Sequence, residues 1–70
     1  MEKILRLNKN FYKEKIIKKA ISDFRGITKI KMKKEKKYFV LFFSDFPKDF
    51  EKIIEKEFGN YVFCLSQIEK

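Results

Sequence analysis

Alternating apolar and polar residues predict two short strands, and an unbroken apolar run predicts a third. In residues 3–7, "KILRL", Leu5 and Leu7 are separated by an arginine, and in residues 27–33, "ITKIKMK", every second residue from the third onward is lysine. A period of two is typical of a strand with one buried face. Residues 38–43, "YFVLFF", are apolar throughout, as expected of a central strand that is covered on both faces.

A helix is predicted between the first two strands. Over residues 11–24 the apolar side chains recur at helical spacing, and most of the lysines fall on the opposite side. This is the pattern of an amphipathic helix. We expect Asn8 or Asn10 to cap its start and Gly26 to stop its end.

The C-terminal segment fits two different structures. Apolar residues from Phe50 to Ile68 are spaced as one face of a single helix, with Pro47 near its first turn. Against this, Gly59 inside a helix costs about 1 kcal/mol. "FGN" could instead end the helix, with residues 61–68, "YVFCLSQI", forming a fourth strand. Periodicity favours the unbroken helix.

This order of elements predicts a single α+β domain over residues 1–70. The sequence strand, helix, strand, strand matches the split β-α-β motif, in which a right-handed crossover leaves a gap that the third strand fills. We therefore expect residues 34–37, "KEKK", to form a hairpin, a three-stranded antiparallel sheet of order 1-3-2, and both helices on one face. The alternative, with a fourth strand, is a ferredoxin-like β-α-β-β-α-β fold.

Composition argues against an enzyme or a metal centre. The chain has no histidine, no glycine-rich phosphate loop and no nucleophile motif, and its one cysteine cannot form an internal disulfide. We expect no catalytic residues, cofactor or metal, and we interpret Cys64 as a small buried hydrophobe. No apolar run is long enough for a signal peptide or a membrane span, so we expect a soluble cytoplasmic protein without a membrane partner.

The formal net charge of +8 raises the question of an anionic partner. Sixteen of the eighteen basic residues are lysine, whereas bidentate phosphate recognition favours arginine. The lysines of residues 29–37 have a simpler interpretation as charge that protects an edge strand and hairpin from aggregation. A second hypothesis is a single-stranded nucleic-acid site, in which Lys29, Lys31 and Lys33 contact phosphates beside a stacking Tyr38.

The strongest candidate surface is the outward side of the third strand. If both helices cover the other face, Tyr38, Val40 and Phe42 point outward together with Ile4 and Ile27. An apolar stripe on so small a domain predicts a protein or peptide partner, or a homodimer. The open edge of the first strand is also available for pairing with an extended peptide.

The chain resembles the small D-type accessory proteins of His-Xaa-Ser radical-maturase systems. The likeness lies in "LNKNFY" before the first helix, "DFPKDFEKI" before the last, and "EFGNY" near the C-terminus. Phe58 and Asn60 match that family's C-terminal signature, whereas Gly59 and Tyr61 stand where leucine and aspartate are usual. The resemblance implies a non-catalytic partner of a radical S-adenosylmethionine enzyme and its precursor peptide.

A second likeness is to RNA-recognition domains and depends on "KKYFVLFF", residues 36–43. That family's third strand carries a basic residue, a glycine, and aromatics that stack on bases. Tyr38 matches a stacking aromatic, but Lys37 replaces the glycine and Val40 replaces the second aromatic. The first strand, "ILRLN", also lacks the aromatic of the family's other motif.

Overall fold

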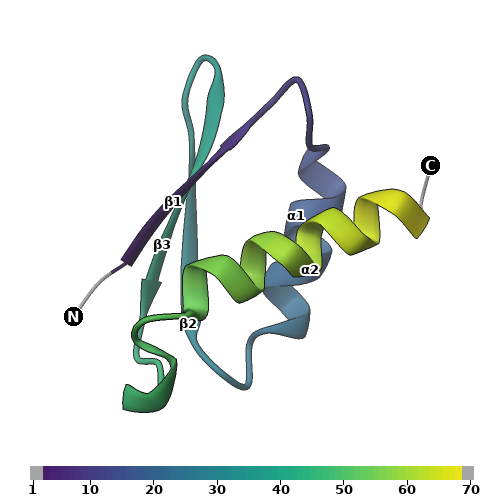
Figure 1. The fold of residues 1–70 in the computed structure, drawn as a ribbon. Helices are drawn as coiled ribbons and strands as arrows, with labels where there is room; N and C mark the ends of the chain where they lie inside the picture. Colours follow the sequence, from purple (N-terminus) through teal and green to yellow (C-terminus); the bar gives the residue numbers. More distant parts are fainter. Residues whose placement is uncertain (1–2, 69–70) are drawn as a thin grey trace.

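The computed structural model describes residues 3–68 and has the element order β-α-β-β-α (Figure 1). A short 3-10 helix, η1, precedes the last helix. The elements are β1 (Lys3–Asn8), α1 (Glu14–Asp23), β2 (Lys29–Lys34), β3 (Tyr38–Ser44), η1 (Lys48–Phe50) and α2 (Ile54–Ile68).

The sheet has the predicted order β1-β3-β2, with β3 antiparallel to both neighbours. Leu41 marks the centre of the register, since it lies between Leu5 of β1 and Met32 of β2. The uninterrupted apolar run thus occupies the central strand, and the two alternating segments form the edges. An α+β fold with this topology is confirmed.

The C-terminal segment is a helix, so the favoured prediction is confirmed and the alternative of a fourth strand is wrong. α2 continues through Gly59 to Ile68. The physical reason is its spacing: Ile54, Phe58, Val62 and Leu65 recur every three or four residues, and all four are buried. This buried stripe outweighs the cost of one glycine inside the helix.

Both helices pack on the same face of the sheet, as predicted (Figure 1). The Phe58 ring of α2 lies at the centre of this core. Its centroid is 5.0 Å from that of Phe24, which caps the end of α1, and 5.3 Å from that of Phe43 on β3, with both contacts edge-to-face. The other buried core residues are Leu7, Ile16, Ile17, Ala20, Phe39, Leu41, Ile54, Val62 and Leu65.

The ends of α1 differ from the predicted ones. The helix begins at Glu14, and its N-cap residue, Lys13, makes no side-chain capping bond. Asn8 does not cap the helix because its side-chain oxygen accepts the N–H of Asn10 at 2.8 Å, within a turn. The helix ends at Asp23, and Gly26 has no positive φ. It therefore does not act as a left-handed helix stop.

A hydrogen bond joins the two helices at the edge of the core. The hydroxyl of Tyr61 donates to a carboxylate oxygen of Asp23 at 2.5 Å, and the Tyr61 ring also contacts Phe24. Because the carboxylate holds the phenolic proton and its charge opposes ionisation, the pKa of Tyr61 is raised above 10.0. This bond secures α2 against α1 only while the phenol is protonated.

Replacing Gly59 with alanine should raise the free energy of unfolding by about 1 kcal/mol. The added Cβ would meet only Leu5 Cδ2, at 4.0 Å, an ordinary van der Waals contact. Urea unfolding followed by circular dichroism measures the change. Gln67→Ala is the control, because glutamine and alanine differ little in helix propensity. A loss of stability in Gly59→Ala would contradict the open space seen at this glycine.

The Tyr61 bond should make stability depend on alkaline pH. Since the pKa of Tyr61 is higher in the folded state, its contribution is complete below pH 10.0 and disappears as pH rises through the raised value. Tyr61→Phe keeps the ring and removes the hydroxyl. Urea unfolding of both proteins is measured between about pH 8 and about pH 11. Wild type should have a higher free energy of unfolding than Tyr61→Phe at the lower pH, and this difference should narrow above pH 10.0. A constant difference would contradict the assignment.

Candidate functional site

The face of the sheet opposite the helices carries both sets of residues that the sequence singled out. Directly opposed residues of antiparallel strands share a face, so Arg6, Val40 and Lys33 form one row, and Ile4, Phe42 and Lys31 form the next. We call this surface the free face. Its residues are Ile4, Arg6, Asn8, Lys29, Lys31, Lys33, Tyr38, Val40, Phe42 and Ser44.

The free face is less apolar than predicted. Val40 is only 3 % exposed although it is not part of the core beneath the helices. Because its row neighbours are Arg6 and Lys33, long aliphatic stems with charged ends border it on both sides. The expectation of an exposed Val40 is therefore wrong.

The remaining apolar candidates on this side are scattered. Tyr38 is 39 % exposed and Ile4 is 45 % exposed, whereas Phe42, which lies beside Ile4, is half-buried. Ile27 is exposed in the turn before β2 and does not belong to the sheet. The structure therefore brings Ile4 and Phe42 together but does not form the continuous stripe that the sequence suggested.

Positive charge dominates the free face. Lys29 forms an ion pair with Asp45 at 3.2 Å. Within residues 3–68, Arg6, Lys31 and Lys33 have no such partner. Lys29, Lys31 and Lys33 all lie on β2, which is an edge strand. Their position agrees with the interpretation of lysines as protection of an edge.

The other edge, β1, exposes main-chain groups. The N–H of Lys9 donates to the carbonyl of Lys37 at 3.0 Å. Since hydrogen-bonded and non-bonded pairs alternate in antiparallel strands, the N–H and C=O groups of Ile4 and Arg6 point away from β3. The carbonyl of Asn8 is already occupied by the N–H groups of Phe11 and Tyr12. The open part of the edge is therefore centred on Ile4 and Arg6.

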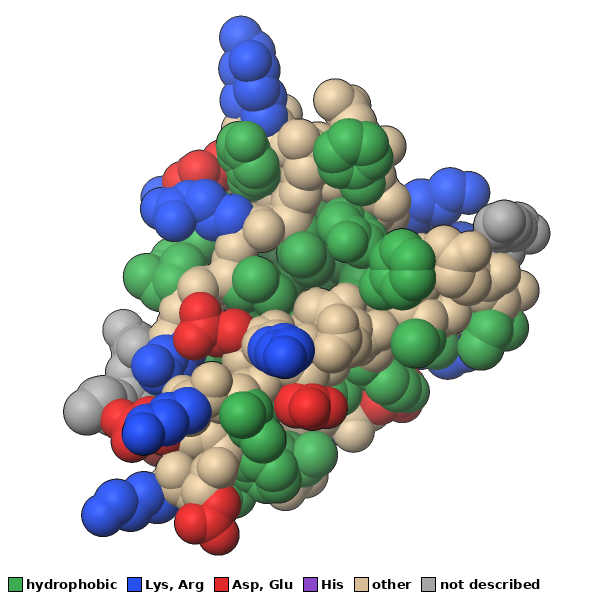
Figure 2. Space-filling model, in the orientation of Figure 1, with side chains coloured by type: hydrophobic (Ala, Val, Ile, Leu, Met, Phe, Trp, Pro, Cys, Tyr) green, Lys and Arg blue, Asp and Glu red, His purple; other side chains and the backbone are tan. Residues whose placement is uncertain are grey.

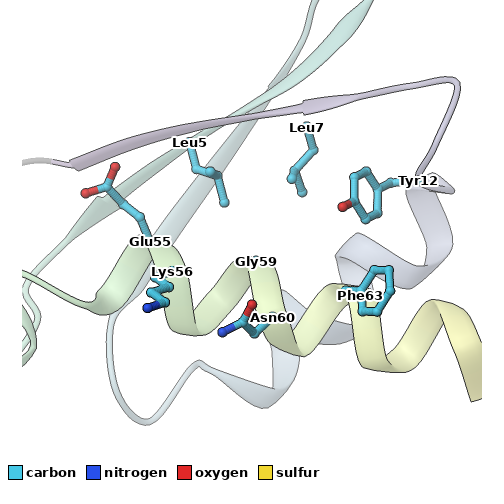
Figure 3. A pocket seen from close by; sticks show the side chains of 8 residues that line it. All are labelled: Leu5, Leu7, Tyr12, Glu55, Lys56, Gly59, Asn60 and Phe63. Carbon is cyan, nitrogen blue, oxygen red and sulfur yellow. The ribbon is translucent and has the colours of Figure 1, made fainter.

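An apolar groove runs between this edge and α2. It has a volume of about 510 Å³ and is lined by Leu5, Leu7, Tyr12, Glu55, Lys56, Gly59, Asn60 and Phe63. Figure 3 shows Leu5 and Leu7 pointing from β1 towards α2, with Gly59 facing them across the gap. Figure 2 shows hydrophobic side chains gathered over the same region. Phe63 remains 54 % exposed beside it.

Sequence reasoning did not identify this groove. The strand pattern predicts only that Leu5 and Leu7 share one face, and Gly59 is interpreted from the sequence as a cost to the helix or as its stop. A signal was nevertheless present, because a glycine inside an amphipathic helix leaves a gap in whatever the helix covers. Here that gap lies opposite Leu5.

A smaller groove of about 380 Å³ lies at the β2 edge. Its lining includes Arg25, Lys29 and Lys31, together with Thr28, whose hydroxyl donates to the carbonyl of Ser44 at 2.7 Å. Ile21 and Ile30 also line this groove, so it combines apolar side chains with three cations. The groove beside β1 has leucine and aromatic side chains and one lining cation, Lys56. The two edges of the sheet have different surface chemistry.

Other candidate chemistry is limited in the part of the chain that the structure covers. Cys64 is exposed on α2, so its expected burial is wrong, because it falls outside the stripe of Phe58, Val62 and Leu65 that faces the sheet. No three or more acidic, histidine or cysteine side chains of residues 3–68 gather as metal ligands would. Nor is any helix within that range long and apolar enough to cross a membrane.

No family model matches the chain, and neither the curated proteins nor the solved structures contain a significant match.

Proposed function

We propose that the protein is a non-catalytic peptide-binding module that adds an extended segment of its partner to the β1 edge. The observation that carries this proposal is the combination of main-chain groups at Ile4 and Arg6 that point away from β3, unpaired within residues 3–68, with an apolar groove directly beside them. Main-chain hydrogen bonds supply affinity in strand addition, and pockets for alternate side chains supply specificity. The β1 edge offers both.

Geometry favours this edge over the free face for an apolar contact. A strand laid beside β1 would direct every second side chain towards α2, into the groove that Leu5 and Gly59 help to line. On the free face, the central Val40 is buried and is therefore not accessible to a partner. The resemblance to D-type accessory proteins suggests that the segment is a precursor peptide presented to a radical S-adenosylmethionine enzyme.

A proline at position 6 should abolish peptide capture without disturbing the sheet. The N–H of Arg6 points away from β3, and proline is tolerated on edge strands at such positions. The probe is a phage library of nine-residue peptides with valine at alternate positions. Wild type should enrich binders and Arg6→Pro should not. Arg6→Val is the matched control, because it loses the same charge but keeps the N–H, and it should still enrich peptides.

Two further measurements complete this experiment. Circular dichroism checks that Arg6→Pro is folded. Gly59→Leu blocks the groove independently, because it fills the groove from the side of α2. Gln67→Leu, on the exposed part of α2, is the control for Gly59→Leu. Equal enrichment by wild type and both blocked variants would refute the proposal. Sedimentation velocity shows whether wild type is a dimer. If it is, and Arg6→Pro is a monomer, the segment that pairs with β1 belongs to a second copy of the chain and not to a peptide partner.

The second candidate function is single-stranded nucleic-acid binding on the free face. It is favoured by Arg6, Lys31 and Lys33, which have no ion-pair partner within residues 3–68, close to the exposed Tyr38. Such a site would contact phosphates through the cations and stack a base on the tyrosine.

Salt titration tests this candidate. If three cations contact phosphates, the logarithm of the association constant for a twelve-nucleotide single strand should fall against log salt with a slope of about −2. Lys31→Gln with Lys33→Gln should flatten the slope, whereas Lys13→Gln with Lys15→Gln, which removes the same charge near the start of α1, should not. Fluorescence anisotropy measures both. Absence of binding at about 50 mM salt would eliminate this function.

A further inference from the structure

We infer that the β1 edge selects peptides with an acidic residue directly opposite Arg6 and an apolar residue on each side of it. This inference rests on the proposed strand addition and specifies the partner's sequence. Three features carry it: the direction of the Arg6 main chain, the charge on the adjacent free face, and the apolar lining of the groove.

The first step is the register. Because the N–H and C=O of Arg6 point to the open edge, a strand added antiparallel to β1 can form a hydrogen-bonded pair with this residue. The partner residue in that pair projects its side chain onto the same face as the Arg6 side chain. It therefore lies on the free face, next to the guanidinium group and on the side of Arg6 away from Val40.

The second step is charge. Arg6 is exposed, and no carboxylate of residues 3–68 pairs with it. Beyond Val40 in the same row lies another cation, Lys33. A carboxylate at the partner position can bind the guanidinium through two hydrogen bonds, whereas a lysine there would add a third positive charge to the row. The chain's net charge of +8 also favours an acidic partner over a second copy of the protein.

The third step concerns the neighbouring partner residues, which point to the opposite face and so into the groove. One lies beside Leu5, in the part of the groove that Gly59 also lines. The other lies beside Leu7, with Tyr12 and Phe63 lining the same end of the groove. Both environments favour apolar side chains. The resulting pattern is apolar, acidic, apolar.

Defined peptides test the selection. Three labelled nine-residue peptides differ only in their central residue, which is glutamate, glutamine or lysine. A valine stands on each side of that central residue. Fluorescence anisotropy with wild type should give the order glutamate, glutamine, lysine, with about a threefold change at each step, typical of a cross-strand charge pair. Arg6→Glu should reverse this order, and Arg6→Gln should make the three peptides nearly equivalent.

The outcomes distinguish the selection of acidic peptides from the proposed strand addition on which it rests. If wild type binds all three peptides equally and Arg6→Pro binds none, the selection is refuted and strand addition stands. The selection is also refuted if Arg6→Glu keeps the preference of wild type. If neither wild type nor any variant binds any of the three peptides, strand addition and the selection are both refuted.

Discussion

The packing of the Phe58 ring against Phe24 and Phe43 joins all three parts of the domain, because these residues belong to α2, to the end of α1 and to the central strand. Small domains are usually stabilised by disulfides or a bound metal. In this chain of 70 residues, which has no disulfide, aromatic packing takes that role. It also sets where α2 crosses the sheet. Gly59, the next residue, consequently faces Leu5 of β1.

The open edge of β1 follows from the same helix. A fourth strand after α2 would have run parallel to β3. By the split β-α-β rule the two strands would have left a gap that β1 fills, so the fourth strand would have lain beside β1. The chain instead continues as helix to Ile68. The place beside β1 is therefore unoccupied within residues 3–68, with the apolar groove beneath it. An extended partner segment would complete the sheet where the chain itself does not.

The two edges of the sheet differ in a way that net charge alone does not reveal. β2 carries lysines at alternate positions, and they discourage pairing with another strand. β1 carries one cation on the free face, Arg6, and leucines on the helix side. Both edges contribute to the same positive total, but Arg25, Lys29 and Lys31 line the groove at β2, whereas Lys56 is the one cation among the lining residues at β1. The distribution of charge, and not its sum, makes β1 the binding edge in our proposal.

Local patterns determined much of this protein: two alternating segments, one apolar run and two amphipathic helices predicted the strand order and the helix-covered face. These features follow from the periods of strands and helices and from the handedness of crossovers, which a sequence displays directly. Only the tertiary structure decided that Val40 is buried between Arg6 and Lys33, that Cys64 is exposed, and that Leu5 and Gly59 line one groove. The burial of Val40 depends on side chains of the two neighbouring strands, and the other two features depend on how α2 packs on the sheet.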